Sequence, residues 1–138
     1  MPILYATVAH GSTVLAEYAA RSGNFSQLAK QLLQKIGSAN ARQTYTFEQH
    51  FIHYMVFDSI VYLCIADDKT NRTLAFAFLE DVKNRFTAMY PRAKDAIAFE
   101  YQTDFARILR QLMVRIILSS ISLVFSLTLK SVPLGILL

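Results

Sequence analysis

The sequence predicts an α+β fold with five strands and three helices in the order ββαβββαα. The chain has 138 residues, 54% of them hydrophobic, and a formal net charge of only +4, so it can bury one core and fits a single domain. Short β-prone runs mix with segments whose apolar residues recur every three or four positions, which indicates strands and amphipathic helices. The single cysteine, Cys64, excludes a disulfide framework and indicates a reducing compartment.

A hairpin is expected first. Ile3 to Ala9 and Thr13 to Tyr18 are rich in β-prone residues and flank the turn residues His10-Gly11-Ser12.

A helix follows the hairpin. Its apolar stripe, at helical spacing, consists of Phe25, Leu28, Ala29, Leu32, Leu33 and Ile36. Asn24 is expected to cap the helix together with Gln27, as in a capping box, and Gly37 is expected to end it in the left-handed conformation.

Three further strands are expected at Thr44 to Glu48, Phe51 to Phe57 and Ile60 to Ala66, with connections short enough for antiparallel hairpins. The last of these is apolar at every position. Both of its faces must therefore be covered, so we expect it at the centre of the sheet with helices on each side.

Two more helices complete the pattern. The first, expected to be the longest, runs from Asn71 to the Tyr90-Pro91 stop. Its inward residues are expected to be Ala75, Phe78, Leu79, Val82, Phe86 and Met89. The second begins near Thr103-Asp104, whose side chains can cap it, and places Phe105, Ile108, Leu109 and Leu112 on one stripe.

The last 25 residues differ from the rest. They hold Arg115 and Lys130 and no acid, and Ile116 to Leu129 carries no charge and shows neither helical nor alternating polarity. We therefore expect a domain at residues 1–113 and an apolar tail at 114–138. Three interpretations of Val114 to Leu138 stay open: a membrane anchor, a segment docked on the domain, and a disordered segment.

The residues predict no enzyme, no cofactor and no metal. His50 and His53 lie three apart at a strand, which sends them to opposite faces, and His10 stands in a turn. Asp67-Asp68 is interpreted as a solvated loop and Cys64 as core. Basic residues are interleaved with acids, which argues against nucleic acid. What is left is a surface formed by the first helix beside Tyr45 and Phe47, which is either a binding groove or ordinary core.

Several short blocks together resemble a longin domain. They are Ile3-Leu4-Tyr5-Ala6, Val8-Ala9, Gly11, Thr13-Val14-Leu15-Ala16, Gly23-Asn24-Phe25, His53-Tyr54, the run from Ile60 to Asp68, Ala77-Phe78-Leu79 and Phe86. The resemblance covers residues 1 to about 113 and is strongest to the long R-SNAREs, the vesicle-associated membrane proteins of late endosomes, lysosomes and vacuoles. It implies one helix on one face of a five-stranded, mainly antiparallel sheet and two on the other.

The resemblance also implies a function, regulation of membrane fusion in vesicle-mediated transport on the cytosolic face of endomembranes. The partners it implies are SNARE helices or trafficking adaptors, bound in a groove between the first helix and the third strand. Carried over residue by residue, the groove consists of Leu28, Leu32, Leu33, Ile36, Tyr45 and Phe47. Membrane contact is expected through Val114 to Leu138.

One departure from the long R-SNARE pattern leaves a second function open. The heptad region with a central Arg that follows the longin domain in that family is not found in this sequence. The alternative is a scaffold subunit of a small-GTPase exchange or adaptor complex, because longin-like folds also serve there.

Overall fold

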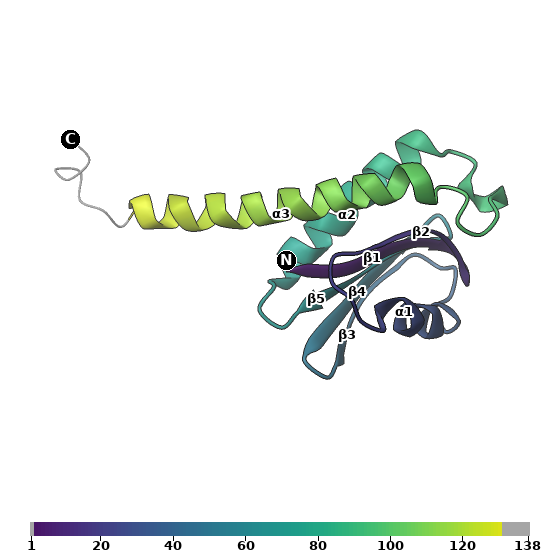
Figure 1. Ribbon diagram of the computed structural model, residues 1–138, viewed down its shortest axis with the longest axis horizontal. Coiled ribbons are helices and arrows are strands. Elements are labelled where there is room, and N and C mark those ends of the chain that lie inside the picture. The colour runs from purple at the N-terminus through teal and green to yellow at the C-terminus, as the bar shows by residue number, and fades with distance from the viewer. Residues whose placement is uncertain (1, 131–138) are drawn as a thin grey trace.

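The computed structural model describes residues 2–130, and the side chains of residues 2–118. Five antiparallel strands form one sheet in the order β2-β1-β5-β4-β3. Helix α1 covers one face, and α2 and α3 cover the other (Figure 1). The elements are β1 (Ile3–His10), β2 (Thr13–Ala19), α1 (Phe25–Leu33), β3 (Ala41–Phe47), β4 (His50–Phe57), β5 (Ile60–Asp67), α2 (Arg72–Met89), a short 3-10 helix η1 (Ala93–Asp95) and α3 (Gln102–Lys130). The predicted fold class and element order are confirmed.

Strand β5 lies at the centre of the sheet, as predicted, between β1 and β4. Its side chains alternate between two hydrophobic clusters, because successive residues of a strand point to opposite faces. Tyr62 and Cys64 join the larger cluster beneath α2 and α3. Leu63 and Ile65 join the smaller cluster beneath α1. An apolar run without alternation is therefore what a strand covered on both faces requires.

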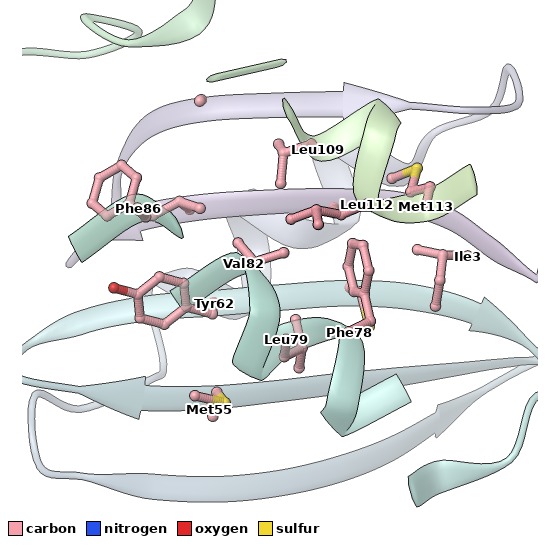
Figure 2. Close-up of a cluster of buried hydrophobic side chains, with 14 of the residues drawn as sticks. Ile3, Met55, Tyr62, Phe78, Leu79, Val82, Phe86, Leu109, Leu112 and Met113 are labelled. Atoms are coloured by element: carbon pink, nitrogen blue, oxygen red, sulfur yellow. The ribbon is translucent and has the colours of Figure 1, made fainter. Parts of the chain in front are cut away.

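The larger cluster joins α2 and α3 to the sheet (Figure 2). Its members from the two helices include Phe78, Leu79, Val82, Phe86, Leu109, Leu112 and Met113, and those from the sheet include Ile3, Met55 and Tyr62.

Helix α1 differs from the prediction at both ends. It stops at Leu33, so Ile36 lies beyond it. Asn24 is the N-cap residue, but its side chain makes no capping hydrogen bond, because its backbone (φ −90°, ψ 28°) does not have the extended conformation of a capping residue. The predicted capping box with Gln27 is therefore wrong. Gly37 is not in the left-handed region either, and the helix instead ends with the Lys35 N–H donating to the Leu32 carbonyl at 2.9 Å.

Helix α2 begins as predicted, with Asn71 as its N-cap and the Asn71 side chain accepting from the Thr73 N–H at 2.7 Å. Five of the six expected inward residues are buried, whereas Met89, in the last turn, is 42% exposed. Phe76, which the sequence pattern left out, is also buried and covers β4.

Helix α3 extends far past its predicted core stripe. It starts at Gln102 and runs to Lys130, which makes it longer than α2 and carries it beyond the sheet (Figure 1). The helix continues because no Gly or Pro interrupts the chain between its start and Pro133. The helix thus covers residues 114–130 of the segment for which three interpretations stay open, while residues 131–138 and the side chains from 119 onward lie outside the described part.

The beginning of the expected tail takes part in the fold. Ile116 is 5% exposed and belongs to the larger cluster, whereas Val114 and Leu118 are 44% and 61% exposed. None of the helices in the described part of the chain combines the length and apolarity that a bilayer span needs.

Candidate protein-binding groove

The groove lies between α1 and the edge strand β3. Helix α1 packs mainly on β1, β2 and β5, the strands farther from β3 in the sheet order. The face of β3 on the α1 side of the sheet is therefore left open. Because side chains alternate along β3, Tyr45 and Phe47 share this face, and they are 47% and 42% exposed. Two large aromatic side chains are therefore held in solvent next to the apolar flank of a helix.

An open depression of about 220 Å³ joins the two elements. Its lining consists of Leu28, Gln31, Leu32, Lys35, Tyr45, Thr46, Phe47 and Ile52. The lining is mainly apolar and includes one cation, Lys35, and no acid.

Four of the six residues expected in the groove meet there: Leu28, Leu32, Tyr45 and Phe47. Leu33 is only 1% exposed and belongs to the smaller core cluster. Ile36 packs against that cluster from the turn after the helix. Both support the groove from outside its lining.

Ile52 was missed by the sequence analysis, although it forms part of the floor. It faces Tyr45 across the β3–β4 ladder. The register that pairs these two residues follows from the tight turn at Glu48-Gln49 and could have been counted back from it.

The aromatic rings of the groove are anchored to the sheet. Tyr45 stacks on Tyr54 of β4, with ring centroids 6.0 Å apart and an interplanar angle of 19°. Burial raises the pKa of Tyr54, and the neighbouring Tyr45 raises it further, so the Tyr54 hydroxyl stays protonated at neutral pH. The buried Tyr54 ring thus supports the exposed Tyr45 ring from the sheet side.

The two edge strands differ in whether other segments hydrogen-bond to their outer edges. Along β2, the Phe99 N–H donates to the Val14 carbonyl at 2.7 Å and the Tyr101 N–H to the Leu15 carbonyl at 3.2 Å. The Gln102 side chain also bonds the backbone N–H and carbonyl of Glu17, at 2.8 and 2.9 Å. In the described structure no strand pairs with the outer edge of β3. The open edge thus lies beside the groove.

The histidines are placed by packing. His50 and His53 do point to opposite faces, since His50 meets the edge of the Phe25 ring of α1 and His53 that of Phe76 of α2. His53 is 1% exposed, so it is buried between the sheet and α2. His10 pairs with Thr13 at the end of β1, one position before the turn.

The other candidates for chemistry have structural roles. Cys64 is fully buried, and burial raises the pKa of its thiol, which disfavours the reactive thiolate. The Asp67 carboxylate accepts from the Lys69 N–H at 3.1 Å and the Thr70 hydroxyl at 2.6 Å, which closes the loop before α2. Among the described residues, no three potential ligands gather into a metal site.

Comparison with known proteins assigns the chain to a family. Residues 15–109 match the Longin family, described as a regulated-SNARE-like domain. The chain is 44% identical over 114 residues to vesicle-associated membrane protein 7B of Dictyostelium discoideum, a match that covers 82% of this chain and 44% of that protein.

Animal and plant relatives agree. Identity is 44% over 110 residues with vesicle-associated membrane protein 7 of Mus musculus, covering 79% of this chain and 50% of that protein. It is 40% over 113 residues with vesicle-associated membrane protein 711 of Arabidopsis thaliana, covering 80% and 52%. The chain spans about half the length of the curated relatives it matches. Its longin domain is a regulatory domain and not an enzyme. On its fold and these matches, the chain belongs to the Longin family of regulated-SNARE-like domains.

Proposed function

We propose that this chain is a regulatory longin domain of R-SNARE type, which acts in vesicle-mediated transport and membrane fusion by binding a SNARE helix or a trafficking adaptor in the α1–β3 groove. The observation that carries the proposal is the pair of exposed aromatic side chains, Tyr45 and Phe47, beside an apolar depression. Exposed apolar patches of this kind are typical of interaction sites.

The chemistry of the lining favours an amphipathic segment. A helix that enters an apolar groove presents anchors at positions i, i+3 or i+4 and i+7. Leu28 and Leu32, one helical turn apart, can interdigitate with such anchors. Lys35 at the rim favours an acidic residue next to them.

The resemblance to the long R-SNAREs supports a location on the cytosolic face of late endosomal, lysosomal or vacuolar membranes. The names of the matched relatives place those proteins at vesicle membranes. Exposed Val114 and Leu118 support contact of the C-terminal segment with an apolar surface, a membrane among them.

Phe47→Asp tests the groove most cleanly. Leu32 is half-buried against the smaller core cluster, so a charge there would also damage the core, whereas Phe47 is 42% exposed at the end of an edge strand. Met89→Asp is the matched control, because Met89 is equally exposed at 42% and lies in the last turn of α2. Circular dichroism and thermal melting establish that both variants are folded.

The binding probe is the half of mouse vesicle-associated membrane protein 7 that this chain does not match. By calorimetry, Phe47→Asp is expected to weaken binding at least about tenfold, as loss of an interface hot spot does, while Met89→Asp binds like the unaltered chain. Equal binding by both variants would refute the groove. A chain that binds nothing and forms an obligate dimer would instead favour the scaffold alternative.

A further inference from the structure

Helix α3 runs well past the sheet that it covers (Figure 1). Ile116 is its last buried residue in the described part of the chain, and the helical backbone continues from there to Lys130. The α1–β3 groove lies on the other face of the sheet. A function of the groove therefore does not account for this projecting part of α3.

The side of α3 that faces away from the sheet changes character along the helix. Arg107 and Arg110 are exposed in the first half, and Val114 and Leu118, further on, are 44% and 61% exposed. These four positions are three or four residues apart, so they follow one side of the helix. Cations are thus followed by apolar side chains along a single exposed line.

The cations of α3 are available to an anionic partner. Arg107, Arg110 and Arg115 are exposed, and none of the salt bridges in the described part of the chain involves them. The one acid in the sequence of the helix is Asp104, in its first turn. Each basic residue near an anionic lipid surface strengthens binding about fivefold. The helix therefore combines exposed apolar side chains with positive charge.

The register of α3 favours a lipid surface over a protein groove. With the helix established as far as Lys130, one side of it holds the positions of Arg115, Ser119, Ser122, Ser126 and Lys130. Most other positions between Ile116 and Leu129 are aliphatic or aromatic. A protein groove covers one flank of a helix, whereas a hydrocarbon layer covers a wide apolar face and leaves a polar line at the headgroups.

The length of the segment favours a helix that lies parallel to the membrane. The charge-free run from Ile116 to Leu129 measures about 21 Å as a helix, against about 30 Å for the hydrocarbon core of a bilayer. A spanning orientation would also bury the polar line in hydrocarbon. In the parallel orientation the whole line reaches the headgroups.

We propose that α3 from Arg107 onward lies on the surface of an anionic lipid bilayer, with Val114 and Leu118 inserted below the headgroups and the arginines among the lipid phosphates and carboxylates. The sheet then lies on the far side of α3 from the membrane, and the α1–β3 groove stays open to partners. The inference rests on the membrane location proposed above and is independent of the groove.

Vesicles of phosphatidylcholine, with or without phosphatidylserine, are the probes, and flotation of the full chain on a density gradient is the readout. The chain is expected to float with the phosphatidylserine vesicles and to bind pure phosphatidylcholine at least about tenfold more weakly, because several arginines contribute. Equal binding to both kinds of vesicle, or flotation with neither, would overturn the proposal.

Leu118→Asp tests the apolar contact. It is expected to weaken binding to the phosphatidylserine vesicles at least about tenfold, because it removes a buried leucine and adds a repelled charge. Ile97→Asp is the matched control, since Ile97 is 71% exposed in the loop before α3, and it should bind like the unaltered chain. Equal losses in the two variants would overturn the assignment to α3.

Arg110→Gln tests the charge. It is expected to weaken binding to the phosphatidylserine vesicles about fivefold and to leave binding to pure phosphatidylcholine unchanged. Arg21→Gln, at an exposed position in the loop before α1, is the control and should change neither. Phe47→Asp should bind vesicles like the unaltered chain, so the groove and the membrane surface of α3 fail or stand separately.

A fluorescence measurement keeps the test decisive if Leu118→Asp disturbs the helix. The chain contains no tryptophan, so Leu118→Trp supplies a single reporter. Its emission is expected to shift to the blue when phosphatidylserine vesicles are added, and unchanged emission would overturn the proposal. A blue shift without vesicles, together with a dimer in sedimentation, would assign Leu118 to a contact between two copies and overturn it as well.

Discussion

The imidazole of His53 is held by its neighbours in one protonation state. Its Nδ1 lies 3.0 Å from the Thr44 hydroxyl, which in turn accepts from the Arg72 Nε–H at 3.0 Å. The Thr44 hydroxyl can donate to Nδ1 or accept from it, because an oxygen that accepts from Arg72 keeps a second lone pair. Nε2 is buried without a partner among the described residues, next to Phe76.

Burial lowers the pKa of His53, and the positive charge of Arg72 lowers it further. In the unfolded chain this residue takes up its proton near pH ~6.5, whereas in the folded chain it does so at lower pH. The unfolded state therefore binds more protons between the two values, and the free energy of unfolding falls as the pH drops below ~6.5.

His53→Leu is expected to reduce this fall. Thermal melting at about pH 7.5 and about pH 5.5 should show a smaller loss of Tm in the variant than in the unaltered chain. His10→Leu, at the end of β1, serves as the control and should keep the full loss, because His53 is still present. The same loss of Tm in all three proteins would mean that His53 is not the titrating group.

At the scale of elements, the two Asn residues that precede helices have different roles. The Asn71 side chain accepts from the Thr73 N–H, and its backbone is extended (φ −61°, ψ 135°). Asn24 has no such bond. Local sequence alone does not separate them, because the backbone angles at a cap depend on how the preceding loop approaches the helix.

Asn71→Ala is accordingly expected to lower the free energy of unfolding by about 1 kcal/mol, the usual cost of losing an N-cap. Asn24→Ala, the matched control, should change it by less than about 0.5 kcal/mol. Urea denaturation measures both. Equal losses would show that the Asn24 side chain caps α1 in solution.

The sequence predicted the strands well because their apolar patterns record burial directly. The unbroken run Ile60–Ala66 could only be a strand covered on both faces, and β5 is one. The groove was predicted less completely. Periodicity placed Leu28, Leu32 and Leu33 on one apolar stripe of the helix. It cannot tell which residues of a stripe are fully buried, as Leu33 is, and which line an open groove, as Leu28 and Leu32 do.

Helix α3 was underestimated for a different reason. The sequence from Ile116 to Leu129 carries no charge, and the periodicity argument needs two unlike faces to detect a helix. An uncharged stretch without Gly or Pro can nevertheless continue a helix that has already been nucleated. For the same reason, the sequence pattern did not identify Ile116 as a core residue. Ile116 lies in the charge-free stretch and packs in the larger cluster.

At the scale of the whole molecule, the sheet separates two hydrophobic clusters. Helix α3 covers the larger cluster and also contacts the edge strand β2. Phe105, Leu109 and Met113 are fully buried along α3, and the segment just before α3 hydrogen-bonds β2. The last buried position on α3 in the described part of the chain is Ile116. We therefore expect the domain to need the helix as far as Leu118, beyond the boundary at residue 113 predicted from the sequence.

A truncation series tests where the domain ends. A chain that stops at Leu118 should keep the Tm of the full chain, because every buried contact described for α3 is retained. A chain that stops at Met113 loses Ile116 and leaves the adjoining core uncovered, so its Tm should be lower, although the transition should stay cooperative.

Point substitutions in the full chain separate the loss of core packing from the loss of helix length. Ile116→Ala should cost about 2–5 kcal/mol of unfolding free energy, as truncation of a buried aliphatic side chain does. Val114→Ala, at a position 44% exposed on the same helix, should stay within about 0.5 kcal/mol. If Ile116→Ala is neutral and the chain ending at Met113 melts like the full chain, the domain ends at residue 113 and everything beyond it serves contacts outside the domain.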